Sequence, residues 1–375
     1  MSEVKNKKVL VLLSGGVDSA VAAALLAKKG YSVTGVFMIF SSASQSLAEK
    51  ENKCCSLEAQ ESARRVASCL KIPFYTMNLA REFREKVIRY FLQEYKNGRT
   101  PNPCVACNRE IKFGVMLTRA LALGFDYVGS GHYVKSEKRK VKSVKQGAGS
   151  ARRKAQSVKL FQAKDQKKDQ SYFLYTLTQE KLKHLLFPLG DCLKSEAREM
   201  AKEFNLPVAD RKESQDLCFV GKEKTADFLK KHLAVKIGKI VEIASGKVVG
   251  EHQGLPFYTI GQRKNIGIGG IGPFYVTAFD FAENILWVSQ DKNDPALFGK
   301  KLKVKNPSWI AGSAPKFPLQ CRVKIRSMYK PALAVARTQN SILLVDFQKP
   351  QKAITPGQAA VFYRGREMLG GGTIC

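Results

Sequence analysis

The N-terminal segment places an apolar run directly before a glycine turn and a helix, and this order constrains the fold more than any other feature. Residues 8–13 read KVLVLL, which is typical of a central strand in a parallel sheet. Ser14, Gly15 and Gly16 interrupt the run, and residues 18–29 are rich in Ala and Leu, which favours a helix that Gly30 ends. A strand, a tight turn and a helix predict the first unit of an α/β sheet.

Strands and helices continue to alternate along the first third of the chain. We expect strands at residues 31–40, 72–79 and 127–130, and helices at 57–70, 81–96 and 110–123. This alternation predicts a doubly wound, mostly parallel α/β sheet. We expect residues 98–108 (GRTPNPCVACN) to form a loop, because two prolines and an Asn–Pro step disfavour helix and sheet alike.

The pattern changes near Gly238. Short β-rich runs are separated there by Gly, Pro and Asn turns; they lie at residues 239–243, 274–278, 285–288, 321–325 and 341–347. This spacing predicts an all-β part, either a small barrel or a sandwich.

The chain is strongly basic. Its 63 Lys and Arg residues outweigh 32 Asp and Glu residues, for a formal charge of +31. A field of this size attracts a polyanion, with nucleic acid the first candidate and an anionic membrane the second. No basic amphipathic helix with a clean apolar face supports a membrane, and plain solvated lysine accounts for part of the excess. Residues 135–168 hold 13 Lys or Arg, and we expect a mobile basic loop that faces solvent and meets RNA phosphates; a loop without RNA contact is the alternative.

No stretch approaches the roughly 20 apolar residues that span a bilayer. Only eight residues, Met1 to Lys8, precede the first apolar run, and Gly15 and Asp18 interrupt that region, which does not resemble a secretory signal. We therefore expect a cytoplasmic location and no membrane partner.

The turn after the first expected strand has the composition of an anion-binding loop. It reads Ser14-Gly15-Gly16-Val17-Asp18-Ser19, and the glycines let the backbone fold around an anion in front of a helix N-terminus. It is not a Walker A loop, since no Gly-Lys-Ser/Thr follows. The alternative is a simple tight turn that Asp18 helps to cap. Met38 and Gly131 lie at the ends of expected strands, where ligands of open α/β sheets collect; alone, Met38 is more typical of a core.

Nine cysteines, an odd number, argue against a disulfide scaffold in a chain without a secretion signal. Cys104 and Cys107 form a Cys-x-x-Cys, and Cys218 follows about 110 residues later. A zinc half-site or surface thiols are the alternatives, but zinc needs four ligands, and Cys54 and Cys55 are adjacent rather than spaced. Thiolates near basic groups are good nucleophiles, and they can hold a persulfide or form a disulfide.

These motifs together resemble one family, the bacterial tRNA-specific 2-thiouridylases (MnmA), within the ATP pyrophosphatase superfamily. The resemblance runs almost end to end, through SGGVDS, GYSVTGVFM, GRTPNPCVACNREIKF, GSGHY, KKDQSYFLYTL, the Cys218 segment, GEHQGLPFYTIGQRKNIGIGG, ITPGQAAVFYRG and LGGGTI. It implies a catalytic domain of the ATP pyrophosphatase type at 1–216 with a basic insertion near 135–168, a small central domain at 217–287, and a C-terminal β-barrel at 288–375.

The resemblance also implies roles for individual residues. Cys107 matches the nucleophile, Cys218 matches the cysteine that carries the incoming persulfide, and Cys104 is a candidate acid–base group. The positions expected to bind ATP are Leu13, Ser14, Gly15, Gly16, Val17, Asp18, Ser19, Met38 and Gly131. Those expected to contact the target base or the tRNA are Asn102, Pro103, Cys104, His132, Lys168, Asp169, Gln170, Arg326 and Gln358.

The implied reaction is a sulfurtransferase reaction on the wobble uridine of tRNAs for lysine, glutamate and glutamine. ATP, with Mg²⁺, adenylates the uracil 2-carbonyl oxygen, and a Cys218 persulfide replaces that oxygen, giving 2-thiouridine, AMP and pyrophosphate. Cys107 resolves the Cys218–sulfur bond as a disulfide. The target base has to leave its stack to reach these groups. A cysteine desulfurase or a sulfur-relay protein is the implied donor.

The chain departs from the family pattern at three places: Cys104 stands where some members have Asp, Ile39-Phe40-Ser41 replaces a more polar or Trp-containing sequence, and the basic stretch before Lys168 is long. One alternative keeps the reaction but makes Cys104, Cys107 and Cys218 ligands of a [4Fe–4S] cluster with one open iron. Two alternatives change the function. One is an amide-forming ATP pyrophosphatase, which would need an amidotransferase partner; the other is a basic RNA-binding protein with a vestigial nucleotide site.

Overall fold

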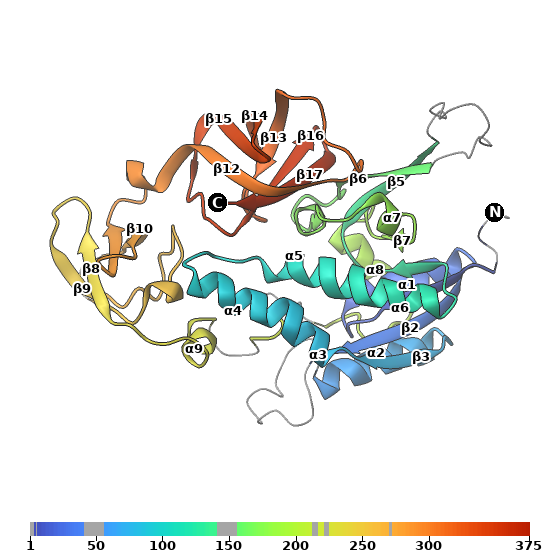
Figure 1. Ribbon diagram of the computed structural model, residues 1–375. Helices are drawn as coiled ribbons and strands as arrows, with labels where there is room; N and C mark the ends of the chain where they lie inside the picture. Colours follow the sequence, from blue (N-terminus) through green and yellow to red (C-terminus); the bar gives the residue numbers. More distant parts are fainter. Residues whose placement is uncertain are drawn as a thin grey trace.

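The computed structural model describes residues 4, 6–40, 56–140, 156–211, 217–220, 225–269 and 272–375, and three β-sheets organise them (Figure 1). Ser41, Cys54 and Cys55 lie outside the described residues, as does the centre of the basic stretch at 141–155. In the part of the chain that is described, no helix is long and apolar enough to cross a membrane.

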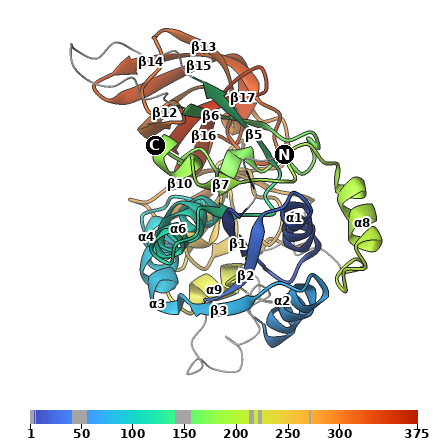
Figure 2. The ribbon, with the colours of Figure 1, turned by 90° about the vertical axis from the view of Figure 1, so that its right-hand side faces the viewer.

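The first sheet is parallel, with strand order β3-β2-β1-β4-β7. Its strands are β1 (Lys8–Leu12), β2 (Ser32–Ile39), β3 (Phe74–Asn78), β4 (Tyr127–Gly129) and β7 (Leu185–Leu186). Figure 2 shows α1 (Val17–Lys28), α2 (Leu57–Cys69) and α8 (Lys194–Glu203) on one side of it, and α3 (Ala80–Phe83), α4 (Arg89–Lys96) and α6 (Met116–Ala122) on the other. The prediction of a doubly wound parallel sheet is confirmed.

The composition of β1 follows from its central place. Val9 and Val11 pack into the cluster that includes the alanines of α1, whereas Leu10 and Leu12 pack into the cluster on the opposite face. A strand covered on both faces needs apolar residues at every position rather than at alternate ones. Because β1 has β2 on one side and β4 on the other, the strand order reverses beside it, which is where such sheets bind ligands.

The prediction of a loop over residues 98–108 is wrong for its second half, where Pro103–Cys107 forms the helix α5. Asn102 caps α5, its side-chain oxygen accepting a hydrogen bond from Val105 N at 3.3 Å. Proline is tolerated in a first helical turn, since its missing N–H would have no partner there. The chain then continues through the π-helical segment η2 (Asn108–Val115) into α6, and a similar segment, η1 (Arg84–Ile88), joins α3 to α4.

The expectation of a mobile basic loop is wrong for the two ends of the basic stretch. β5 (Val134–Lys140) and β6 (Gln156–Gln162) form an antiparallel hairpin, and β6 pairs with β17 of the C-terminal barrel. Val158 and Leu160 are buried between more exposed Ser157 and Lys159. This alternation of apolar and polar residues builds a strand despite the surrounding lysines.

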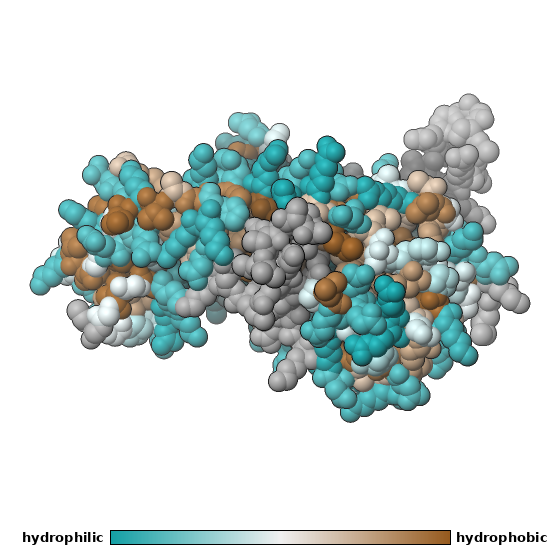
Figure 3. All heavy atoms as spheres, turned by 90° about the horizontal axis from the view of Figure 1, so that it is seen from below, coloured by the Kyte–Doolittle hydropathy of each residue, from teal (hydrophilic) through white to brown (hydrophobic). Residues whose placement is uncertain are grey.

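A small central part follows, with the helix α9 (Thr225–Lys230) and the mixed sheet β10-β11-β8-β9. Its strands are β8 (Gly238–Glu242), β9 (Val248–His252), β10 (Tyr275–Asp280) and β11 (Ile285–Ser289). Apolar side chains are visible on the surface of this end of the molecule in Figure 3; exposed ones in this part include Ile237, Val248 and Phe281.

The C-terminal part is a closed antiparallel barrel, which confirms that prediction. Its strands are β12 (Phe298–Trp309), β13 (Leu319–Lys324), β14 (Ala332–Gln339), β15 (Ile342–Lys352), β16 (Ala359–Arg364) and β17 (Glu367–Ile374), and pairing of β12 with β17 closes the ring. Short helical segments join the elements: η3 (Ser171–Phe173), α7 (Gln179–Leu182), η4 (Leu255–Phe257) and η5 (Pro295–Leu297).

Candidate active site

The turn after β1 has a shape that only glycine allows. Gly15 has φ +74°, and a Cβ there would lie 2.3 Å from the Ala59 carbonyl oxygen of α2. Gly16 is the N-cap of α1 and contributes no capping side chain, so the first-turn N–H groups of this helix point to the space above the turn. Val17 begins the helix and is buried. Free N–H groups at a helix N-terminus bind phosphate.

Hydrogen bonds hold the turn before any ligand arrives. Ser19 Oγ donates to the Gly16 carbonyl at 3.0 Å and accepts from Ser14 N at 3.1 Å. Leu13 N donates to Val36 O of β2 at 2.9 Å, which fixes the start of the turn. Gly131, just beyond β4, packs against α1 so closely that a Cβ would lie 2.7 Å from Ser19 N.

Three residues that sequence reasoning missed surround this turn. Tyr133 Oη donates to Asp18 Oδ1 at 2.8 Å, and Lys194 Nζ donates to the same oxygen at 2.5 Å. Arg211 donates from Nη1 to the Gly15 carbonyl at 2.9 Å. Burial, followed by the charge of Asp18, raises the pKa of Tyr133, so this hydroxyl stays a donor. The turn thus lies beside two cations and a fixed hydroxyl.

Two of the three candidate thiols, Cys104 and Cys107, lie on helix α5. Cys104 is exposed on the first turn of this helix, and Cys107 is buried at its end, with a side chain that belongs to an apolar cluster. Asn102 holds the helix start through its cap, while Pro103 is buried. Cys104, Cys107 and Cys218 all carry thiols in the structure. The two cysteines of the Cys-x-x-Cys therefore have different surroundings, and only Cys104 is open to solvent.

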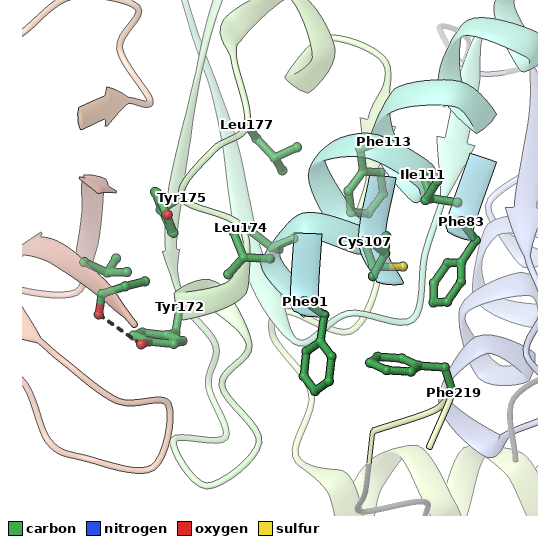
Figure 4. Packing of buried hydrophobic residues seen from close by; sticks show 14 of the residues in the cluster. Phe83, Phe91, Cys107, Ile111, Phe113, Tyr172, Leu174, Tyr175, Leu177 and Phe219 are labelled. Atoms are coloured by element: carbon green, nitrogen blue, oxygen red, sulfur yellow. Dashed lines mark hydrogen bonds between the residues drawn. The ribbon is translucent and has the colours of Figure 1, made fainter. Parts of the chain in front are cut away.

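Aromatic rings bring the Cys218 segment to Cys107. Phe219, next to Cys218, packs edge-to-face on Phe91 and Phe83, with ring centroids 5.1 and 5.9 Å apart. Figure 4 shows Cys107 among these three rings. Cys107 and Phe219 belong to one apolar cluster, against which Cys218 packs. Phe219 is thus the anchor of the Cys218 segment, which the sequence signalled only by an aromatic residue beside a cysteine.

The same cluster extends to the nucleotide-binding end of the sheet. Met38, near the carboxyl end of β2, is a buried member of it. Phe40 follows β2 and stacks on Phe83 at 4.5 Å between centroids, and Phe83 contacts Phe219. A line of rings therefore joins the end of β2 to the residue beside Cys218.

Gln358 holds the loop before α5 against the barrel. Its Nε2 donates to the carbonyls of Thr100 and Pro101, both at 3.1 Å. Thr100 N donates to Pro356 O at 2.9 Å, and a Cβ at Gly357 would lie 2.7 Å from Thr100 O. A polar cavity of about 20 Å³ remains between Asn102 and the barrel, which is enough for one water. The barrel thus positions the segment that carries Cys104.

His132, one of the residues expected to contact the tRNA, is buried. Its Nδ1 lies 2.6 Å from Ser130 Oγ, and its ring packs near Phe113 and Phe187. Burial, and to a smaller degree the charge of Lys112, holds the pKa of His132 well below its ordinary value. This imidazole is therefore neutral at physiological pH.

Asp169 lies inside the molecule, between the α/β domain and the barrel, and Gln170 beside it is half-buried. Asp169 accepts hydrogen bonds from Ala163 N at 3.1 Å and Ser171 Oγ at 2.9 Å, and it lies 3.6 Å from Lys324 Nζ of β13. Burial lowers the pKa of Lys324, while Asp169 opposes that change. Removing one partner of a buried ion pair is costly, since the other charge is left alone.

The neighbours of Asp169 also have structural contacts. Gln170 Oε1 accepts from Tyr133 N at 2.9 Å, and Gln170 N donates to Tyr133 O at 2.9 Å. Lys168 N donates to Asp165 Oδ1 at 3.3 Å. Gln170 therefore supports Tyr133, which in turn contacts Asp18 of the glycine turn.

Arg326 joins the central part to the barrel. Its Nη2 donates to Thr355 Oγ1 at 2.7 Å and to the Ile260 carbonyl at 2.9 Å. Among the described residues its buried Nε has no hydrogen-bond partner. Of the expected RNA-contacting residues, Cys104 is exposed and Lys168 is half-buried, whereas Asp169, Arg326 and Gln358 contact another part of the chain.

The donor set for a metal cluster is not assembled. Within the described ranges, no three His, Cys, Asp or Glu side chains come together as ligands for a metal ion. A [4Fe–4S] cluster with one open iron needs three thiolates around one point. Cys104, Cys107 and Cys218 do not provide this arrangement, so the residues present do not fit the cluster.

Family models match the three parts in order. Residues 7–222 match a tRNA methyl transferase HUP domain, residues 226–290 a tRNA methyl transferase PRC-barrel domain, and residues 299–374 an aminomethyltransferase β-barrel domain. The sheet, its glycine turn and the two matching β parts thus define a HUP-domain protein of the tRNA-modifying class.

Relatives identify the family within this class. A tRNA-specific 2-thiouridylase MnmA of Carboxydothermus hydrogenoformans is 44% identical over 100% of this chain and 99% of that protein. Those of Roseiflexus castenholzii and Francisella philomiragia are 45% and 42% identical over at least 98% of both chains. The chain belongs to the tRNA-specific 2-thiouridylase (MnmA) family. A solved 4-thiouridine synthetase–RNA complex with bound ATP is a distant likeness, with TM-score 0.35 and 19% identity over 60% of this chain and 50% of that one.

The family models speak of methyl transfer, whereas the full-length relatives are thiouridylases. The full-length relatives decide between these descriptions, because they match this chain from end to end at 42–45% identity.

Proposed function

We propose that this chain is an ATP-dependent tRNA 2-thiouridylase that adenylates the wobble uridine and replaces its 2-oxygen with sulfur from a cysteine persulfide. The observation that carries the proposal is the placement of Cys107 and the Cys218 segment on one apolar cluster, which reaches the end of β2 beside the glycine turn. The residues proposed for uridine activation and those proposed for sulfur transfer thus lie on the same apolar cluster or beside it. Within this proposal the catalytic domain is residues 1–216, the small central domain that begins with the Cys218 segment is 217–287, and the C-terminal β-barrel is 288–375.

The glycine turn binds the phosphates of ATP. Gly15, Gly16 and Ser19 shape the turn, and the α1 N-terminus supplies N–H donors. Asp18, whose side chain is 37% exposed, fits Mg²⁺, which prefers carboxylate oxygen. When bound, Mg²⁺ neutralises phosphate charge. Met38 is buried near the carboxyl end of β2, the end of the sheet where adenine is expected to bind.

Adenylation makes the uracil oxygen a leaving group. Its O2 bonds to the α-phosphorus of ATP, the bond to the bridging oxygen breaks, pyrophosphate leaves, and the N3 proton is released. Cys104, exposed on the first turn of α5, is placed to take that proton. Asn102 and Pro103, beside it, position the flipped base.

Sulfur transfer then proceeds through two thiols. The terminal sulfur of a Cys218 persulfide bonds to C2, and AMP leaves with the oxygen. Cys107 thiolate attacks Cys218 Sγ, the bond to the transferred sulfur breaks, and the uracil keeps that sulfur and regains its proton. The products include a Cys107–Cys218 disulfide, which an external dithiol reduces.

The partners follow from the charge and from this chemistry. A net charge of +31 attracts tRNA, and exposed groups such as Lys138 and Arg139 on β5 extend the basic surface. The substrates are tRNAs for lysine, glutamate and glutamine, and the persulfide comes from a cysteine desulfurase or a relay protein. Such a reaction belongs in the cytoplasm, with the tRNA pool.

A single-turnover assay tests the proposal. The protein is loaded with labelled sulfur by a cysteine desulfurase and mixed with ATP and an unmodified tRNA for glutamate. We expect AMP, pyrophosphate and 2-thiouridine in equal amounts, and a matched tRNA with cytidine at the wobble position should give none. Thiolation without AMP release would contradict the proposal.

A further inference from the structure

Lys194 is a largely covered cation at the nucleotide-binding turn that no motif assigns. It is the first residue of α8, and its Nζ lies 2.5 Å from Asp18 Oδ1, 176 residues away in the chain. The Lys194 side chain is only 11% exposed. Lysine is seldom buried to this degree without a specific partner.

The backbone at Lys194 is fixed in place. Lys194 N donates to Asp165 Oδ2 at 3.0 Å, and Leu193 N donates to Glu196 Oε2 at 2.7 Å. Lys164 Nζ holds Glu196 from the other side at 2.7 Å. The Asp165 and Glu196 carboxylates thus accept hydrogen bonds from the backbone N–H groups at the start of α8. The Lys194 side chain reaches Asp18 in the glycine turn.

The position of this charge does not serve its own helix. The N-terminus of a helix carries a partial positive charge, so it favours Asp or Glu and disfavours lysine. Glu196 meets that preference in the same turn of α8. The stability of α8 therefore does not explain why a lysine stands at position 194. We attribute its presence there to its contact with Asp18.

The surroundings hold the ammonium beside Asp18 at the glycine turn. Tyr133 also donates to Asp18 Oδ1, at 2.8 Å, and the Lys194 Nζ lies 6.0 Å from the centre of its ring. An ammonium has three N–H donors in a compact group. It can therefore keep its bond to Asp18 and bind a phosphate oxygen at the same time. Without such a cation, the Asp18 carboxylate would repel the phosphates of ATP.

We propose that Lys194 is a catalytic residue of adenylation, which binds the β- and γ-phosphates of ATP and bridges them to Asp18. This inference rests on the proposed function, in that the turn takes ATP. As the bond from the α-phosphorus to the bridging oxygen breaks, negative charge grows on the departing pyrophosphate, and the Lys194 ammonium stabilises it.

Binding of three probes to the full chain tests the role, with ATP, pyrophosphate and AMP measured by calorimetry at low Mg²⁺. Lys194→Ala should weaken ATP and pyrophosphate by about 10- to 100-fold, the range for a charge-assisted hydrogen bond, and AMP by less than about 2-fold. Lys194→Arg should recover part of the loss, because it keeps the charge. Lys202→Ala, on the exposed face of the same helix, is the control and should bind all three as the parent does.

The outcomes separate the alternatives. An equal loss for ATP and AMP would show that Lys194 only supports the turn through Asp18, and it would overturn the inference. An unchanged affinity for pyrophosphate would overturn it too. Since Lys194→Ala could disturb the turn, Lys194→Gln, which keeps most of the length and a donor but removes the charge, is measured beside it and should show the same selective loss. A parent protein that bound neither ATP nor pyrophosphate would overturn the proposed function along with this inference.

Discussion

The glycine turn and the thiol-bearing helix are held in place by opposite means. Hydrogen bonds and ion pairs from distant segments fix the turn, through Tyr133, Lys194 and Arg211. Around Cys107 and Phe219, packed aromatic rings fix the structure instead, and the Cys107 thiol is buried among them. A group that handles phosphate needs donors and charge, whereas in this proposal Cys107 reacts with Cys218 alone, and the rings around it shield it from other thiols. The two regions should therefore respond differently to substitution.

The largest effect is expected at the turn. Asp18→Ala removes the carboxylate that holds Tyr133 and Lys194, and adenylation should fall by about 10²- to 10³-fold, as for the loss of a key electrostatic group. Affinity for tRNA should stay near the parental value. ATP–pyrophosphate exchange in the presence of tRNA measures the change, with Glu203→Ala on α8 as the exposed carboxylate control. If the Asp18 variant exchanged pyrophosphate at the parental rate, the assignment of the ATP site to this turn would be wrong.

A substitution in the ring cluster should have the opposite selectivity. Phe219→Leu keeps an apolar side chain but loses the edge-to-face contacts with Phe83 and Phe91, which are worth about 0.5–1.5 kcal/mol per pair. We expect sulfur transfer from Cys218 to slow by roughly tenfold, while exchange of pyrophosphate changes little. Pre-loaded protein in a single-turnover assay measures both. Equal slowing of the two activities would mean that the regions do not act separately.

Asn102 caps the thiol-bearing helix, and two variants resolve its role. Asn102→Ala should cost about 1 kcal/mol of unfolding free energy, because the cap of α5 is lost. Asn102→Ser keeps a capping oxygen and should restore that stability. If Asn102 also positions the base, the Ser variant should still thiolate slowly. Thiolation at the parental rate in Asn102→Ser would show that Asn102 only caps α5 and does not position the base.

The smallest effect concerns pH and the buried His132. Its pKa in the folded protein is depressed by burial, so the unfolded chain binds a proton first as the pH falls through about 6.5. The unfolded state is then favoured, and His132 should cost about 0.7 kcal/mol of stability between pH 7 and 6. His132→Gln should reduce the slope of unfolding free energy against pH, measured by denaturant titrations beside the parent protein. An identical slope in the His132 variant would contradict a neutral, buried imidazole.

Much of the fold could be predicted because the pattern was local. The unbroken apolar run of β1 and the short runs after Gly238 each indicated their own kind of sheet. The helix at Pro103–Cys107 was missed, since the two prolines outweighed the Asn102 cap that starts it. In the basic stretch, the lysines concealed the alternation of Val158 and Leu160.

The site could be predicted only where a motif carried it. The glycine turn and the cysteines have local signatures, and these positions carry the proposal. Tyr133 and Lys194 reach Asp18 across 115 and 176 residues, and no local pattern signals such contacts. Asp169 stood in a motif expected to touch RNA, yet it lies in the interior beside Lys324. Whether a motif residue binds a ligand or supports the fold depends on burial, which the sequence does not state.

The division of labour between the turn and the thiols is tested most directly with Cys218→Ser. This variant is given tRNA, ATP and labelled pyrophosphate, and both pyrophosphate exchange and 2-thiouridine are measured in one sample. We expect exchange at a rate within about twofold of the parent, because the turn and its cations are untouched, together with no detectable thiolation, because the persulfide carrier is gone. Loss of exchange along with thiolation would contradict the account, since activation would then depend on the thiol that it assigns to sulfur alone.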